Sequence, residues 1–288
     1  MGDDQSKLYT IRWMRREDFP RCHELREQVG WNQTLRDWER FLSYDPEGCF
    51  VAEVDGIVVG TVCTIPYEDR FGWVAMVIVD PGQRRKGIGT GLLDAGIRHL
   101  EDLGLTVKLD ATPEGRLLYN TLGFTDEYGA ARYHAKGMEV PNPDQLCQPL
   151  SRNDLDELDG YDAPIFGASR RKVLESYLVE YPGIAYAVRK NGLMRGYILA
   201  REGSHAFHIG PWAADAVPAA QSLLYALIRR RKSERIFIDL VDRNPYVRPM
   251  LEVLGFQMQR PFIRMFRGVN RYPGIPEKVY GISGPELG

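Results

Sequence analysis

The sequence predicts an α+β (mixed α/β) fold that occurs twice along 288 residues. Short segments in which apolar residues alternate predict strands, and apolar residues three and four positions apart predict helices between them. The chain is also long enough to bury two cores. Asp55-Gly56 is typical of a tight hairpin turn, and Asn191-Gly192 repeats it in the second half. We therefore expect two tandem domains of one architecture.

The first half reads as an ordered series of strands and helices. Helix 34–43 begins at Thr34, which is a typical capping residue. Thr112 lies directly before helix 113–122 and caps it. The expected elements in order are strand 9–13, helices 16–29 and 34–43, strands 49–54, 58–65 and 73–79, helix 87–103, strand 106–110, helix 113–122 and a strand after Gly123-Phe124.

The second half repeats a further spacing. Pro245 lies ten residues before Gly255, as Pro113 lies ten residues before Gly123. Two independent spacings over so long a repeat indicate two domains rather than a solenoid. A linker that contains two prolines, residues 138–144, separates the repeats. The predicted domains are residues 1–140 and 145–288.

Composition excludes several classes of protein. The 37 Lys and Arg residues balance 39 Asp and Glu, so we expect no nucleic-acid partner. No apolar run approaches the roughly 18 residues of a membrane span, and the first residues lack a signal-peptide core, so we expect a cytoplasmic protein that does not contact a membrane. Four widely spaced cysteines without a Cys-x-x-Cys pair indicate neither a disulfide framework nor a metal site. The oligomeric state stays open.

A glycine-rich, basic turn lies between strand 73–79 and helix 87–103. Arg84, Gly87 and Gly89 fit the pattern Arg/Gln-x-x-Gly-x-Gly/Ala. Glycines let a backbone close around a phosphate, and the free amides and positive end of the helix attract it. A dinucleotide-binding fingerprint, with Asp110 as its acid, and a purely structural helix start are the alternatives.

At this turn the chain resembles the GNAT (Gcn5-related N-acetyltransferase) superfamily. The resemblance implies domains with a mixed, mostly antiparallel sheet flanked by helices, and a turn that holds the pyrophosphate of acetyl-CoA. It also implies that the strand before the turn splays from its neighbour, so that Val77 and Val79 offer backbone contacts to the pantetheine arm. The implied cofactor-binding residues are Val77, Val79, Arg84, Arg85, Lys86, Gly87, Ile88, Gly89 and Thr90.

The resemblance also suggests a catalytic acid. Tyr119 lies four residues before Gly123, where many GNAT enzymes carry the tyrosine that protonates the CoA thiolate. A phenol, with a pKa of about 10, is a usable proton donor at neutral pH. The implied reaction is acetyl transfer from acetyl-CoA to a primary amine by direct attack on the thioester, with CoA as product and without a metal. The alternative is a CoA-sensing or partner-binding protein without turnover.

Residues on the acceptor side are less distinct. Trp31, between the first two helices, is a candidate wall or cation–π platform for an amine, or packs against helix 34–43. Glu68 and Asp69 occupy a hairpin that could face the acceptor, but the general base stays open, and the sequence favours an ordinary surface residue at each position. A small-molecule amine is the expected acceptor.

The second repeat has lost the features of the turn. Asp215 lies opposite Arg84, and Pro218 and Ala220 lie opposite the two glycines. Leu251 takes the position of Tyr119. Because a carboxylate repels phosphate and proline lacks an amide hydrogen, we expect only the first domain to bind acetyl-CoA. Together with Ile209-Gly210-Pro211 and the segment 280–288, this arrangement resembles bacterial tandem-GNAT proteins with a degenerate C-terminal domain.

Overall fold

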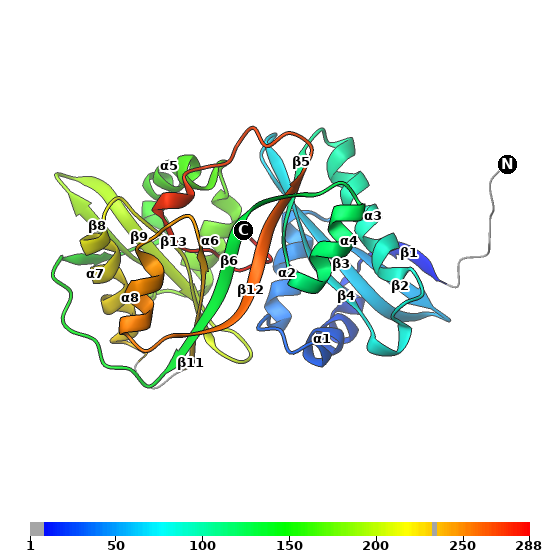
Figure 1. Cartoon of the computed structure of the whole chain (residues 1–288), viewed down its shortest axis with the longest axis horizontal. Coiled ribbons are helices and arrows are strands. Elements are labelled where there is room, and N and C mark those ends of the chain that lie inside the picture. The colour runs from blue at the N-terminus through cyan, green and yellow to red at the C-terminus, as the bar shows by residue number, and fades with distance from the viewer. Residues whose placement is uncertain (1–8, 232–234) are drawn as a thin grey trace. The chain divides into compact units, whose positions relative to one another are not determined.

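A computed structural model describes residues 9–231 and 235–288 (Figure 1). The chain forms two compact units, one up to Val107 and one from Lys108. Residues 1–8, which entered the expectation about a signal peptide, lie outside the described residues.

The first unit contains an antiparallel sheet in the order β1-β2-β3-β4. Helix α3 packs on β3 and β4. The packing is so close that a side chain at Gly96 would meet Val62 and Thr64 of β3. Its elements are β1 (Thr10–Trp13), η1 (Arg16–Asp18), α1 (Phe19–Gln28), α2 (Leu35–Tyr44), β2 (Phe50–Val54), β3 (Ile57–Tyr67), β4 (Phe71–Val79), η2 (Pro81–Gln83) and α3 (Ile88–Asp102), with β5 (Thr106–Ala111) at the boundary.

The second unit contains strands in the order β5-β12-β6-β11-β10-β9-β8-β7, and β13 pairs with β10. Strands β10 and β11 are parallel, whereas β6, β8 and β9 pair antiparallel with their neighbours. Its elements are α4 (Pro113–Thr121), β6 (Thr125–Lys136), β7 (Cys147–Pro149), η3 (Arg152–Asp154), α5 (Leu155–Phe166), α6 (Arg171–Glu180), β8 (Tyr186–Lys190), β9 (Leu193–Arg201), β10 (Phe207–Ala214), α7 (Val217–Ile228), β11 (Arg235–Val241), α8 (Val247–Val253), β12 (Gln257–Arg267), η4 (Pro276–Lys278) and β13 (Val279–Gly281).

The predicted mixed, mostly antiparallel fold is confirmed, and so are the local signals. Thr34 and Asp37 form a capping box at α2, and the Thr112 hydroxyl accepts a hydrogen bond from the Gly115 amide at 3.2 Å. The expected helix 16–29 begins with the short helix η1, and Pro20 stands in the first turn of α1, where its missing N–H costs nothing.

The last strand of the first repeat lies in the sheet of the second. Strand β6 pairs with β11 from Ala130 to Lys136 and with β12 on its other edge. Figure 1 shows green β6 beside orange β12. The compact units therefore divide the chain at Val107, whereas the domain limits 1–140 and 145–288 follow the sequence repeat and stay a proposal.

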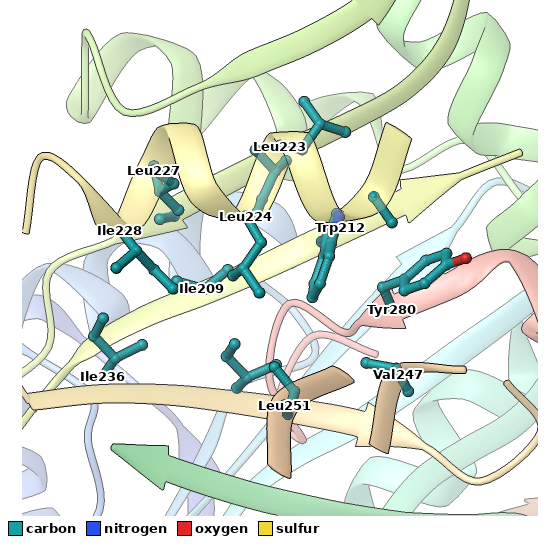
Figure 2. Packing of buried hydrophobic residues seen from close by; sticks show 14 of the residues in the cluster. Ile209, Trp212, Leu223, Leu224, Leu227, Ile228, Ile236, Val247, Leu251 and Tyr280 are labelled. Carbon is teal, nitrogen blue, oxygen red and sulfur yellow. The ribbon is translucent and has the colours of Figure 1, made fainter. Parts of the chain in front are cut away.

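The second unit has an extensive apolar core between α7, α8 and the sheet (Figure 2). Leu251 of α8 is fully buried there, close to the side chains of β10 and β11. The position that carries Tyr119 in the first repeat thus carries a packing residue in the second. Phe207 and Trp212 belong to the same core.

Candidate functional site

The glycine-rich turn begins at Asp80, which two contacts hold in place. One carboxylate oxygen accepts a hydrogen bond from the Gly82 amide at 2.9 Å, and the other pairs with Arg21 of α1 at 2.6 Å. Arg21 also donates to the Val58 carbonyl of β3 at 3.1 Å. The turn is therefore fastened to both a helix and the sheet.

The turn ends in left-handed backbone at the start of α3. Arg85 and Gly87 have φ of 61° and 79°. The first hydrogen bond of the helix runs from the Gly91 amide to the Gly87 carbonyl at 2.9 Å. Since the first amides of a helix have no partner within it, the amides before Gly91 face outward at the positive end of α3. This is an anion-binding geometry.

Sequence reasoning missed two residues of this turn. The Tyr9 hydroxyl donates to the Gly87 carbonyl at 3.1 Å. A side chain at Gly91 would come within 2.5 Å of the same hydroxyl, so a larger residue there would displace the Tyr9 side chain. Gly91 continues the alternate glycines at Gly87 and Gly89, a signal that could have been read. Tyr9, 78 residues away in sequence, carried no signal.

Three exposed cations surround the turn. Arg84 donates to the Val79 carbonyl at 3.3 Å, and Lys86 donates to the Gln83 amide oxygen at 2.7 Å. Among the described residues, neither these two nor Arg85 forms an ion pair with a carboxylate. Their charge is thus available to an anion at the helix N-terminus.

Strand β4 is irregular where it approaches the turn. Its register with β3 shifts by one residue between Thr61 and Cys63, and Met76 has a φ of 54°. The Thr61 hydroxyl donates to the Met76 carbonyl at 2.7 Å and holds this bulge. A bulge redirects the backbone that follows it, here at half-buried Val77 and Val79.

Tyr119 belongs to the second unit and lies on α4. Its ring packs against Phe124, with ring centroids 5.9 Å apart, and against the backbone at Gly115. Burial raises the pKa of the Tyr119 hydroxyl, so the phenol stays protonated at neutral pH. Within the described part of the chain, the hydroxyl has no hydrogen-bond partner. The hydroxyl is therefore available to donate a hydrogen bond.

The acceptor-side candidates are spread over two loops of the first unit. Trp31 is half-buried, and its carbonyl accepts a hydrogen bond from Arg26 at 3.0 Å. Glu68 is exposed and pairs with Arg70 at 3.3 Å, and Asp69 beside it is also exposed. Trp31 lies between α1 and α2 and Glu68 lies in the turn between β3 and β4, and their joint role in binding an acceptor stays a prediction.

In the equivalent turn of the second repeat, a carboxylate pairs with the neighbouring cations. Asp215 pairs with Lys278 at 2.9 Å and Arg195 at 3.4 Å, and it accepts a hydrogen bond from Tyr161 at 3.1 Å. Helix α7 begins without a side-chain cap and has Pro218 in its first turn. An anion at this helix end would face a carboxylate and find one amide fewer.

Within residues 9–231 and 235–288, the cysteines and possible metal ligands form no further site. Burial raises the pKa of the Cys22 thiol to about 12, so Cys22 is no nucleophile at neutral pH. Across the described residues, no group of three or more His, Cys, Asp or Glu side chains could hold a metal ion. In the same part of the chain, no helix is long and apolar enough to cross a membrane.

A mostly antiparallel sheet with a bulged strand, a cationic glycine-rich turn and a helix N-terminus defines an acyltransferase of the GNAT type. Family comparison agrees for both halves: residues 8–124 match the model "Acetyltransferase (GNAT) family", and residues 159–281 match "Acetyltransferase (GNAT) domain". The chain belongs to the GNAT acetyltransferases and carries two such domains in tandem.

Individual proteins that this chain resembles are also acyltransferases. The chain is 26% identical over 90% of its length to a holothin acyltransferase from Pseudoalteromonas sp. (strain SANK 73390), 87% of which is covered. It is 36% identical to a mycothiol acetyltransferase from Thermomonospora curvata, but this match spans 34% of the chain and only 35% of that protein.

Solved structures share the fold. A Pyrococcus horikoshii protein assigned as an acetyltransferase superimposes with a TM-score of 0.81 at 22% identity, covering 100% of this chain and 99% of that one. A tandem GNAT protein from the clavulanic acid biosynthesis pathway superimposes with a TM-score of 0.61 at 12% identity, covering 90% and 98%.

Proposed function

We propose that this protein transfers an acetyl group from acetyl-CoA to a primary amine of a small molecule and releases CoA. The observation that carries the proposal is the turn at residues 84–90. It combines outward-facing amides, the positive end of α3 and three cations that form no ion pair among the described residues. A diphosphate is the ligand that such a combination attracts most strongly.

The glycine at position 89 supports a phosphate site at the turn. A side chain at Gly89 would make only an ordinary contact, 3.4 Å from Val79, so the protein itself does not require glycine there. On the solvent side of the turn, the absence of a side chain at Gly89 lets a phosphate reach the Gly89 and Thr90 amides. The backbone of Val77 and Val79, beyond the bulge in β4, is proposed to pair with the pantetheine arm.

The reaction follows from the groups on the chain. The lone pair of a neutral amine attacks the thioester carbon, a C–N bond forms, and the C–S bond breaks. Tyr119, which its raised pKa keeps protonated at neutral pH, donates its proton to the leaving thiolate and takes a proton back from solvent once CoA has left. The amine proton leaves to water or to a carboxylate such as Glu68 or Asp69. Trp31 is proposed as an apolar wall for the acceptor.

A small-molecule acceptor is supported by the relatives. The holothin acyltransferase resembles this chain across both repeats, and mycothiol acetyltransferases resemble part of it. Because the second repeat retains the fold without the turn, we propose that it helps to form the acceptor side. The proposal includes a cytoplasmic location, which dependence on acetyl-CoA implies.

Calorimetry with acetyl-CoA tests the proposal. We expect one molecule bound per chain, and loss of binding in Arg84→Asp/Gly87→Pro, which introduces the residues of the second repeat. The matched control is Arg98→Asp on the exposed side of α3, which should bind normally. A screen of amines for thiol release from acetyl-CoA then separates an enzyme from a CoA sensor. Two comparable sites, or unchanged binding by the double variant, would contradict the proposal.

A further inference from the structure

Strands β10 and β11 of the second repeat separate part-way along their length. They pair in parallel from Phe207 to Ile209, opposite Ile236 to Ile238. Beyond this point β10 pairs with β13 instead, Trp212 opposite Gly281 and Ala213 opposite Val279. The carbonyl of Asp239 on β11 accepts a hydrogen bond from the Ile282 amide at 2.8 Å. The segment that begins with β13 thus lies between the two strands.

The packing of this segment leaves no spare room. Gly210 of β10 has a φ of 144°, and a side chain there would lie 1.9 Å from the Ile282 carbonyl oxygen. Tyr280 packs against Trp212, with ring centroids 5.1 Å apart (Figure 2). Ile282 and Leu287 are 2% and 3% exposed, so the segment is part of the core.

Buried polar groups also hold the segment. One nitrogen of the Arg170 guanidinium, on a residue only 5% exposed, donates to the Ser283 hydroxyl at 3.0 Å and to the Gly288 carbonyl at 2.9 Å. The other two nitrogens of the Arg170 guanidinium donate to the carboxylate of Asp162 at 2.7 and 2.9 Å. Tyr177 donates to the Ser283 carbonyl at 3.2 Å, and Glu286 pairs with Arg201. These buried contacts hold the segment by both its side chains and its backbone.

We propose that the gap between β10 and β11 is a peptide-binding cleft, filled by residues 279–288 of the same chain, and that this segment keeps acyl-CoA out of the second repeat. In strand order β10 corresponds to β4, the strand proposed to pair with the pantetheine arm. The comparison with acyl-CoA rests on the proposed function, whereas the binding of the segment in the cleft does not. Two sequence features left without a role, Ile209-Gly210-Pro211 and residues 280–288, meet here.

Hydrogen exchange of the full-length protein, with and without saturating acetyl-CoA, tests this proposal. Peptides that cover residues 279–288 should exchange as slowly as β11, roughly 10³-fold or more below the unstructured rate. Acetyl-CoA should leave them unchanged and slow the exchange of residues 84–92. Rapid exchange of the segment, or a response of the segment to acetyl-CoA, would overturn the proposal. Absence of protection at residues 84–92 would instead contradict the proposed function.

A variant provides a second test. Gly210→Ala places its side chain against the Ile282 carbonyl, so exchange in residues 279–288 should rise at least tenfold and the melting temperature should fall by roughly 5 °C. Gly160→Ala, on the exposed side of α5 where the new side chain meets no atom within 4 Å, is the matched control: it should leave the exchange of residues 279–288 unchanged and should not lower the melting temperature. Equal behaviour of the two variants would refute the proposal. If Gly210→Ala does not fold, exchange of the unmodified chain decides.

Discussion

Single residues determine what the turn can hold and what chemistry can follow. Gly87 supplies left-handed backbone at the start of α3, and Tyr9 fixes the Gly87 carbonyl by a hydrogen bond. Tyr119 supplies a protonated phenol whose pKa is raised by burial. These three residues lie in different parts of the chain.

Tyr119→Phe should lower kcat by about 10²-fold or more while the Kd for acetyl-CoA stays nearly constant, because the hydroxyl matters only as the thiolate forms. Since its pKa is raised, Tyr119 should remain an acid throughout the neutral range, and its own loss of a proton should lower activity only at alkaline pH. Single-turnover kinetics would measure the chemical step. Exposed Tyr246→Phe is the control, and equal kinetics of the two variants would exclude Tyr119 as the acid.

Gly91→Ala should weaken acetyl-CoA binding about tenfold, because its side chain displaces the Tyr9 ring and the Gly87 carbonyl that the ring holds. Calorimetry would measure the effect. Adding Tyr9→Ala removes the obstacle, so the double variant should bind no more weakly than Tyr9→Ala alone. Additive losses would show that Gly91 acts by a route other than Tyr9.

At the scale of elements, β6 is joined to β11 by a buried charged pair as well as by the sheet. Arg132 makes two hydrogen bonds of 2.7 Å to Asp239, and His208 of β10 lies 3.1 Å from the same carboxylate. Burial by itself would raise the pKa of Asp239, but the charge of Arg132 and hydrogen bonds from Arg132 and His208 lower it well below its usual range. The carboxylate thus stays ionised in the folded protein.

Asp239→Asn should lower the free energy of unfolding by about 3–5 kcal/mol at pH 7, because it leaves Arg132 buried without its counter-charge. A carboxylate whose pKa is lowered by folding contributes stability above its unfolded pKa of about 3.9 and loses it as pH falls further. The deficit of the variant should therefore shrink below about pH 4. Urea unfolding at both pH values measures this, with half-exposed Asp242→Asn as control.

At the scale of the whole molecule, exchange of strands makes the repeats depend on each other. Strand β6 comes from the first repeat by sequence but pairs on both edges with strands of the second. A chain divided in the linker would therefore expose both edges of β6 in one fragment and the facing edges of β11 and β12 in the other. Exposed strand edges are prone to aggregation. This dependence contrasts with two domains that merely follow each other along a chain.

A fragment of residues 1–137 should therefore lack a cooperative thermal transition, and so should residues 138–288 alone. Co-expressed, the two fragments should purify together in equal amounts, because β6 regains both partners. Circular dichroism and analytical ultracentrifugation would measure the outcome. A fragment 1–137 that is monomeric and melts cooperatively would contradict the expected dependence.

The sequence by itself determined the fold class, the glycine-rich turn, the helix caps and the loss of the turn in the second repeat. Each depends on residues close together in the chain, such as Thr34 with Asp37 or Gly87 with Gly91. Only the tertiary structure decided the pairing of β6, the contact of Tyr9 with the turn and the cleft that holds residues 279–288. Arg132 and Asp239 are 107 residues apart, and Arg170 and Gly288 are 118 apart. Periodicity and spacing report on neighbours along the chain, whereas such contacts depend on which strands lie side by side.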